Sequence, residues 1–295
     1  MFRDQREFLS HLEKHGELIT LDVPINVTRD DNELMALSRY LSLNEAPGVK
    51  LTNLEGLNTP NVPVYVGNIG SRNRLCMALE ADNWIDAKEK LARAVKTPPE
   101  SWPDPIFVDP SQAPCKEVVI RDHDIDLQTQ VPKAWFGEEW SAMISDNISV
   151  TKDPDTGALN ASALLHSFMD LKPDGTQYDE ELRRRCLISY IFWKPPTGIH
   201  VAENYANAVK RGKGLEIAIA SCIEPQLFII GGGPRCPRGS HEWDKYAMVG
   251  ALRGAPTELV RCETVDLYVP ATAEWVLEGE VLPDLELPDY KHGNF

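Results

Sequence analysis

Prolines divide this chain into two parts of different character. Residues 97–115, TPPESWPDPIFVDPSQAPC, carry a proline every few positions. Proline fixes φ and lacks the backbone donor that helices and central strands use, so this segment predicts a long irregular connection. We therefore expect a domain boundary within it, with one domain over residues 1–105 and a second over residues 106–295.

The first part predicts helices that alternate with strands. Apolar residues recur at helical spacing over 2–16 and 83–96, and a third helix with an acidic first turn is expected over 30–43. Strands are expected over 17–25 and 62–70, where apolar runs end at Pro and Gly. This order is typical of an α/β domain.

The second part predicts many short strands. Its apolar runs are brief and separated by turn signals, and DPDTG at 153–157 is typical of a hairpin turn. One helix is expected near 242–253. Strands at this spacing favour a β-barrel or a sandwich, so the expected fold class is α+β. The runs that predict strands are CKEVVI, SDNISVTKD, ALNASALLHSF, CLISYIFW, EIAIASCI, PQLFIIGGG and ELVRCETVDLYV.

Charge and hydropathy exclude several classes of protein. Asp and Glu number 45 against 30 Lys and Arg, a formal net charge of −15. Nucleic acids and anionic membranes both attract basic surfaces, so we expect neither as a partner. The chain has no apolar run of membrane-spanning length, and its start lacks the apolar core of a signal peptide, which predicts a cytoplasmic location. The six cysteines form no C-x-x-C pair, which argues against a cysteine zinc site.

Two features could bind a ligand, and each has a plainer explanation. The glycines of IIGGGPRCPRG (229–239), after an expected strand, would let a phosphate or a ring approach the backbone, or would simply form an irregular turn. Asn160 and His200, on different expected strands or strand ends, are suitable ligands for Mn, Fe or Zn. Their spacing is not diagnostic, so a satisfied polar pair is the alternative.

Charged residues form three further groups. Arg183–Arg185 and the cluster at 210–213 could contact a phosphate, but solvated turns are the commoner role of surface Lys and Arg. Glu274, Glu278 and Glu280 would act as general acids only if burial raised their pKa values. Spacing alone favours ordinary exposed glutamates.

Three segments together resemble one enzyme family. They are the opening REFLSHLEKHGELITLDVPI with ELMALSRYL, the hairpin VTKDPDTGALNASALLH, and GALRGAPTELVRCETVDLYVPATAEWVLEGEVLP. In this order they resemble the UbiD-like decarboxylases, which use prenylated FMN. The resemblance extends over nearly the whole chain, and the last segment is the most specific.

The resemblance implies both a fold and an activity. It implies an N-terminal α/β domain followed by a split β-barrel like that of flavin reductases. It implies a non-oxidative decarboxylase of an aromatic or α,β-unsaturated carboxylic acid, in which prenylated FMN bonds to the substrate and acts as the electron sink. A divalent metal, usually manganese, and a monovalent cation such as K⁺ would hold the cofactor phosphate. A flavin prenyltransferase would supply the cofactor.

The resemblance also assigns site residues. Asn160 and His200 fall on metal ligands, whereas the third metal ligand, an acid in the family, falls on Lys245. An ammonium repels a metal ion, so either Glu242 or Asp244 would substitute through a local shift, or Lys245 would replace the metal and pair with the phosphate. The positions implied to line the cofactor are Asn160, Ser162, Ala163, Leu164, Leu165, Ile199, His200 and Lys245.

The chain departs from the family pattern where the chemistry takes place. Leu165, followed by His166, occupies the position of the catalytic Arg, and Lys291 occupies that of one catalytic acid. Glu286 is the counterpart of the other acid. The family's C-terminal domain, used for dimerisation and for closing the active site, is expected to be absent.

Three hypotheses follow from this pattern. The first is an active decarboxylase, working as a homo-oligomer or completed by a partner subunit. The second is a degenerate or truncated relative that acts as a binding protein. The third is a split-barrel protein that binds ordinary FMN.

Overall fold

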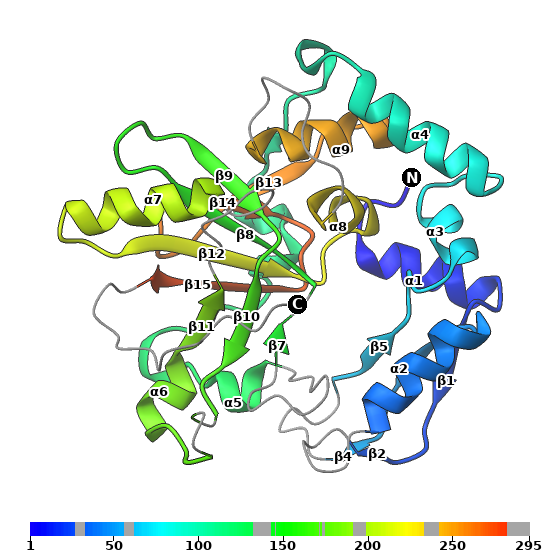
Figure 1. Cartoon of the computed structure of the whole chain (residues 1–295), viewed down its shortest axis with the longest axis horizontal. Helices are drawn as coiled ribbons and strands as arrows, with labels where there is room; N and C mark the ends of the chain where they lie inside the picture. The colour runs from blue at the N-terminus through cyan, green and yellow to red at the C-terminus, as the bar shows by residue number, and fades with distance from the viewer. Residues whose placement is uncertain are drawn as a thin grey trace.

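The computed structural model of this chain has a mixed α+β fold, as the sequence predicted (Figure 1). The strands that it describes form separate sheets and not one closed barrel. Among the described helices, none is long and apolar enough to cross a membrane. The described residues are 1–26, 33–55, 62–131, 143–144, 146–170, 172, 175–190, 199–232 and 242–281.

Side-chain caps fix the N-terminal helices where the sequence predicts them. Helix α1 (Gln5–Lys14) begins after Asp4, whose carboxylate accepts a hydrogen bond from the Glu7 amide at 2.8 Å. Asn83 caps α4 (Trp84–Lys96) in the same way through the Ile85 amide at 2.9 Å. The other described elements of this part are β1 (Leu18–Leu21), β2 (Ile25–Asn26), α2 (Glu33–Asn44), β3 (Gly48–Leu51), β4 (Leu54–Glu55), β5 (Val64–Val66) and α3 (Arg72–Ala78).

The N-terminal helices share a hydrophobic core with the second part of the chain. Ala94, on α4, is buried in the largest core cluster, together with residues of α8 (Pro225–Gly232) and α9 (Lys245–Arg253). Figure 1 shows α4 beside α9. Gln226, on α8, donates from Nε2 to the carbonyl of Ala78 at 2.7 Å. These contacts join residues that precede the proline-rich segment 97–115 to residues that follow it.

One four-stranded sheet organises the second part. Its strand order is β15 (Trp275–Val281), β12 (Leu215–Ser221), β8 (Asn147–Lys152) and β9 (Leu159–Ser162). The β8–β9 connection is the predicted hairpin. Its turn is held by the Asp153 carboxylate, which accepts from the Asp155 amide at 2.7 Å, and by Gly157 at φ +75°.

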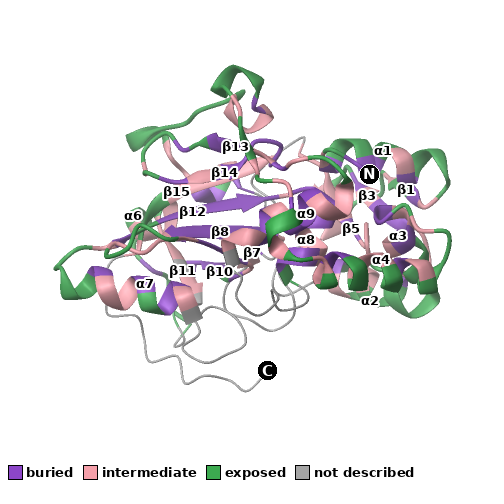
Figure 2. Ribbon diagram, turned by 90° about the horizontal axis from the view of Figure 1, so that it is seen from above, coloured by how far each residue is buried: buried purple, intermediate pink, exposed green. Residues whose placement is uncertain are grey.

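The two faces of this sheet differ in chemistry. Small and aliphatic side chains such as Ile148, Val150 and Ala218 belong to the core cluster with α8 and α9, and Figure 2 shows β8 and β12 buried. Residues paired directly across neighbouring strands point to the same face of a sheet. Ile219, Ser149 and Ser162 are paired in this way across β12, β8 and β9, so they share the opposite face. That face is apolar toward β15 and polar toward β9.

Smaller elements surround this sheet. A second sheet has the order β11 (Leu187–Tyr190), β10 (Leu165–Phe168) and β7 (Met143–Ile144), and a third has the order β14 (Tyr268–Pro270), β13 (Glu258–Arg261) and β6 (Ile106–Phe107). The remaining described elements are the helices α5 (Leu127–Gln130), α6 (Glu180–Arg185) and α7 (Ile199–Lys210), and the 3₁₀ helices η1 (Pro99–Ser101), η2 (Pro110–Gln112), η3 (Pro114–Lys116), η4 (Asp122–Asp124) and η5 (Glu242–Asp244).

Two of the predicted strands are wrong. PQLFIIGGG contains helix α8, not a strand, because a short apolar run fits a buried helix as well as a buried strand and Pro225 suits the first helical position. CKEVVI runs from η3 into a stretch that pairs with none of the described strands, where Val118 is 76% exposed. The helix predicted near 242–253 is confirmed as η5 and α9.

Candidate functional site

Residues that the family resemblance implies converge on the edge strand β9. Asn160 and Ser162 are buried on β9. The start of α7, which carries His200, and η5, which Lys245 directly follows, pack from other parts of the chain, and both helices contact β9. His200 thus lies in the first turn of a helix, and its expected place on a strand is wrong.

The remaining implied lining residues are arranged unevenly. Leu164 is buried between β9 and β10, and Ala163 beside it is half-buried. Leu165, in place of the family's Arg, is 38% exposed on β10. The side chains of Ile199 and Glu242, and the whole of Glu286 and Lys291, lie outside the described residues.

Asn160 presents a buried acceptor without a donor. Its Nδ2 donates to Ser162 Oγ at 3.3 Å, whereas its Oδ1 is sealed from solvent and accepts no hydrogen bond. Buried polar atoms are almost always paired, and leaving one unpaired costs about 1–3 kcal/mol. An orphan of this kind points to a role for the Asn160 oxygen beyond packing.

Lys245 places a buried positive charge at the start of α9. Its side chain is 5% exposed, and Nζ donates to the Gly231 carbonyl at 3.2 Å. That carbonyl belongs to the C-terminal end of α8, the negative end of the helix dipole. The ammonium therefore has a structural partner and also carries its charge into the interior beside η5.

The part of the chain that the structure describes shows no cluster of three or more acidic, histidine and cysteine ligands for a metal ion. Lys245 stands where the resemblance puts the third ligand, and its ammonium would repel a metal ion. An anion complements this position better than a metal does.

The structure adds two polar residues that the sequence did not single out, Asp146 and Ser221. Ser221 pairs with Asn147 across β12 and β8, and the Cys222 amide donates to the Asp146 carbonyl at 3.3 Å. Asp146 Oδ1 and Ser221 Oγ are both buried without a hydrogen-bond partner. Burial raises the pKa of the Asp146 carboxyl to about 7. Only the pairing of β8 with β12 brings Asp146 and Ser221 together, so no local sequence pattern could reveal them.

Replacing Asp146 with Asn is expected to flatten part of the pH dependence of stability. A carboxyl whose pKa rises from 3.8 to about 7 on folding contributes stability below pH 4 that is lost as the pH rises toward 7. The wild type should therefore lose about 4 kcal/mol of unfolding free energy across this window relative to Asp146→Asn, measured by urea unfolding. Asp155→Asn, at an exposed ion pair, is the control. Parallel curves for the wild type and Asp146→Asn would contradict the assignment.

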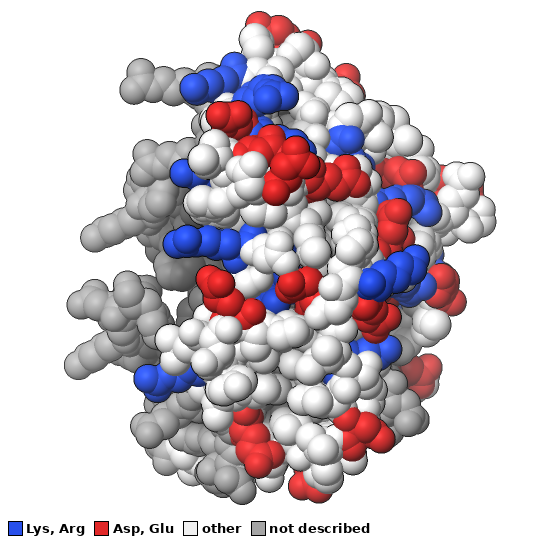
Figure 3. Space-filling model, turned by 90° about the vertical axis from the view of Figure 1, so that its right-hand side faces the viewer, with Lys and Arg blue, Asp and Glu red and all other residues white. Residues whose placement is uncertain are grey.

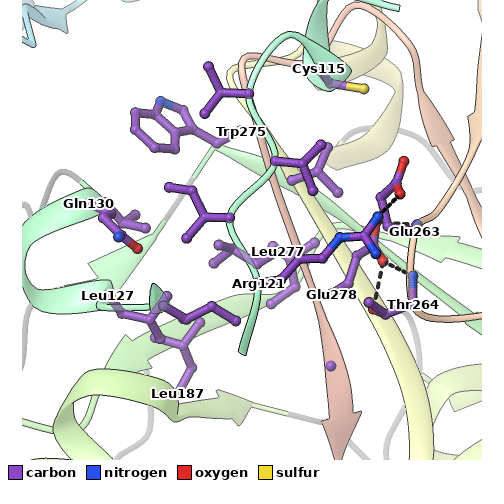
Figure 4. A pocket seen from close by; sticks show the side chains of 18 of the residues that line it. Cys115, Arg121, Leu127, Gln130, Leu187, Glu263, Thr264, Trp275, Leu277 and Glu278 are labelled. Atoms are coloured by element: carbon purple, nitrogen blue, oxygen red, sulfur yellow. Dashed lines mark hydrogen bonds and ion pairs between the residues drawn. The ribbon is translucent and has the colours of Figure 1, made fainter. Parts of the chain in front are cut away.

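A cavity of about 950 Å³ lies at the opposite edge of the same sheet, along β15 (Figure 4). Figure 4 shows apolar side chains around it, with Leu127, Leu187, Trp275 and Leu277 among those labelled. Among the residues that the resemblance implies for the cofactor, none whose side chain the structure describes lines the cavity. Its apolar lining includes Leu127 of α5, Leu187 of β11, Ile217 and Ile219 of β12, and Trp275 and Leu277 of β15.

Ion pairs form one rim of this cavity. Lys116 lies 3.3 Å from a Glu263 oxygen and 3.5 Å from a Glu278 oxygen, and Arg121 also pairs with Glu263. Burial raises the pKa of Glu278, but hydrogen bonds from the Glu263 and Thr264 amides and the Thr264 hydroxyl outweigh burial and lower it overall. Glu278 is therefore an ionised structural acceptor and does not have the raised pKa of a general acid.

The basic clusters have ordinary surface roles. Arg185 pairs with Glu181 one turn earlier on α6, and Arg211 pairs with Asp155. Both ion pairs are exposed, which is the solvated alternative that the sequence favoured. On a different side of the molecule, drawn in Figure 3, basic side chains are likewise interspersed with acidic ones.

Known proteins match the chain along most of its length. The family model described as "3-octaprenyl-4-hydroxybenzoate carboxy-lyase Rift-related domain" of UbiD matches residues 107–295. An uncharacterized protein of Archaeoglobus fulgidus is 27% identical over 96% of this chain and 55% of its own length, and one of Synechocystis sp. is 29% identical over 100% of this chain and 57% of its own. The chain thus spans about half the length of the curated relatives it matches.

Solved structures resemble the chain in fold and sequence. An evolved dimeric form of the UbiD-class enzyme HmfF from Pelotomaculum thermopropionicum, in complex with prFMN, is 28% identical with a TM-score of 0.76, over 96% of this chain and 58% of that one. Vanillic acid decarboxylase of Sedimentibacter hydroxybenzoicus in closed form is 27% identical with a TM-score of 0.78, over 96% of this chain and 56% of that one. A family model that matches most of the chain, together with these structures, shows that the chain belongs to the UbiD family.

Proposed function

We propose that this chain is a decarboxylase of the UbiD class that acts on an aromatic or α,β-unsaturated carboxylic acid with prenylated FMN. The observation that carries the proposal is that helix α7, which carries His200, and η5, which Lys245 directly follows, both contact β9, the strand of Asn160. Two similar structures support it, because HmfF is complexed with prFMN in one and with FMN in another. When bound, the prenylated flavin supplies the electron sink for loss of CO₂.

The position of Lys245 fits a flavin phosphate better than it fits a metal ion, whereas the unpaired Asn160 oxygen, an acceptor, suits a donor or a cation. A phosphate is an anion with strong acceptor oxygens, and a buried ammonium such as that of Lys245 is a strong charge-assisted donor to it. The Ser162 hydroxyl, on the same strand as Asn160, is a further polar group at this place. In this proposal Lys245 supplies the positive charge that a divalent ion would otherwise bring.

Three residues of the chain are proposed to contact the substrate or to transfer protons. Leu165 provides an apolar wall for a substrate ring but no charge for its carboxylate. Burial raises the pKa of the Asp146 carboxyl to about 7, which suits a group that exchanges protons near neutral pH. Glu286 stays the predicted catalytic acid from the resemblance.

The finer architecture belongs to the same proposal. The chain passes from the sheet β15–β12–β8–β9 to the sheet β11–β10–β7 between β9 and β10. In this proposal the two sheets are the two halves of a split barrel. A domain division at 105 and 106 is supported by the start of the family match at residue 107. We further propose an oligomer or a partner subunit, since one similar structure is a dimeric HmfF and another is the ShVdcCD vanillic acid decarboxylase.

Reconstitution tests this function directly. The chain is co-expressed with a flavin prenyltransferase, purified without oxygen, and analysed by absorbance and by mass spectrometry of released small molecules. We expect prenylated FMN to co-purify, and CO₂ to be released from at least one acid of a panel of aromatic and α,β-unsaturated acids. A folded protein that holds no flavin, alone or with added prenylated FMN, would contradict the proposal.

Leu165 favours a second candidate, a cofactor-binding protein without turnover. The position expected for a cationic side chain is apolar, so nothing there orients a carboxylate. This candidate predicts bound prenylated FMN and no CO₂ from any acid in the panel. It also predicts that Leu165→Arg, which returns a carboxylate partner, gives measurable CO₂ release.

A further inference from the structure

A buried histidine joins the two sheets that the β9–β10 step connects. His166 is fully buried on β10, where it pairs in register with Ser189 of β11. Its Nδ1 lies 2.9 Å from Ser189 Oγ, and its Nε2 lies 2.7 Å from Ser149 Oγ on β8 of the other sheet. The proposed function does not use this side chain.

The hydrogen bonds of this network run in one direction. Asn147 Nδ2 donates to the Leu164 carbonyl at 2.7 Å, which fixes the amide, so its Oδ1 accepts from Ser149 Oγ at 3.0 Å. The Ser149 hydroxyl has spent its only hydrogen, so it must accept from His166 Nε2–H. The other ring nitrogen, Nδ1, then accepts the hydrogen of the Ser189 hydroxyl.

The histidine stays neutral while it does this. Burial lowers the pKa of His166 to about 3, and no charged group contributes to the shift. The groups in contact with its two ring nitrogens are the neutral hydroxyls of Ser149 and Ser189. A neutral ring with hydrogen only on Nε2 is the one form that satisfies both contacts and also leaves the Ser149 hydrogen for Asn147.

Ser189 is the last residue of this hydrogen-bond network and also lines the cavity described above. Leu187 and Ser189, two residues apart on β11, both line the cavity and so share a face of their strand. Because the Ser189 hydrogen is given to His166, the hydroxyl oxygen has only lone pairs left for a ligand. Other walls of the cavity are apolar and aromatic, among them Trp275 and Leu277, which Figure 4 labels.

We propose that this cavity binds a small aromatic molecule carrying a hydroxyl or N–H donor, that the Ser189 oxygen accepts this donor, and that His166 is a positioning residue for Ser189. A carboxylate or an ether, which only accepts, finds no donor at Ser189. This inference stands on the cavity and the network and does not depend on bound flavin or on decarboxylation.

A matched ligand pair tests the site on the wild-type protein. p-Cresol and 4-methylanisole differ by the donor, and each is titrated by NMR into the chain without flavin. We expect p-cresol to bind about fivefold more tightly, the usual value of one neutral hydrogen bond. Equal affinities, or no binding of either at millimolar concentration, would overturn the proposal.

Two variants then assign the residues. Ser189→Ala should make the two affinities equal, whereas Ser101→Ala, at an exposed serine outside the cavity, should keep the preference. His166→Phe frees the Ser189 hydrogen, so 4-methylanisole should gain affinity relative to p-cresol. A preference that survives Ser189→Ala refutes the acceptor role.

The tautomer gives a readout that needs no variant. Long-range ¹H–¹⁵N NMR of the wild type should show His166 neutral, with hydrogen on Nε2, from pH 5 to pH 8. Hydrogen on Nδ1, or a titration near pH 6.5, would mean that Ser189 is not held as a donor to the ring and would overturn the positioning role.

Discussion

Lys245→Met is expected to weaken FMN binding about 100-fold, because it removes a buried charge from the proposed phosphate site. A hydrogen bond to a charged group is worth up to about 3 kcal/mol, and the methionine side chain offers no donor in its place. Binding is measured by quenching of flavin fluorescence with FMN and, separately, with riboflavin. Riboflavin lacks the phosphate, so its affinity should change less than threefold.

Two controls separate a local charge effect from general damage. Lys213→Met, at an exposed lysine, should leave the FMN affinity unchanged. A chelator should also leave wild-type FMN binding unchanged, since the ammonium supplies the charge. If Lys245→Met lowered the affinities for FMN and riboflavin equally, or if the chelator abolished FMN binding by the wild type, Lys245 would not be the phosphate partner.

Arg253→Met is expected to cost about 3–5 kcal/mol of unfolding free energy at pH 8. Arg253 Nη1 lies 2.7 Å from a Glu224 oxygen, and the exposed fractions of the two side chains are 7% and 2%. The substitution leaves the Glu224 carboxylate buried without its cation, which is far more costly than loss of a surface pair. Urea unfolding followed by circular dichroism measures the difference.

The pH dependence of this loss gives the prediction a second test. Burial raises the pKa of Glu224 to about 7, although Arg253 acts to lower it. Below about pH 4 the carboxyl is protonated in the folded and the unfolded chain, so the loss in Arg253→Met should be smaller there than at pH 8.

Companion variants isolate the buried pair. Adding Glu224→Gln to Arg253→Met should recover part of the loss at pH 8, because a neutral amide replaces the unpaired charge. Arg261→Met, where the arginine is 66% exposed and pairs with Asp266, should cost less than about 1 kcal/mol. A loss no larger than that of Arg261→Met would show that the buried pair does not stabilise the fold.

The sequence predicted correctly those elements that are determined by neighbouring residues, such as caps, amphipathic repeats and turn residues. The helices α1 and α4 form where capping residues precede amphipathic repeats, and the DPDTG turn forms through Asp153 and Gly157. Helix α8 was missed because its residues are apolar on all sides, so no periodicity distinguishes it from a buried strand. The CKEVVI run has strand-like composition but no described partner strand, and composition alone cannot supply one.

The site was predictable only in part for the same reason. The resemblance named Asn160, His200 and Lys245, and packing on β9 brings their segments together. Asp146 meets Cys222 only through the pairing of β8 with β12, and His166 meets Ser149 only where two sheets face each other. Such contacts join residues that no sequence window contains.

The packing of α4 against α9 has a consequence for synthesis of the chain. Ala94 and its neighbours on α4 bury their apolar face partly against a helix that begins at Lys245. At roughly 5–20 residues per second, a ribosome needs on the order of ten seconds to reach that helix after it has made α4. During this time the nascent chain exposes an apolar helix face, which makes it a natural client for chaperones that hold unfinished proteins.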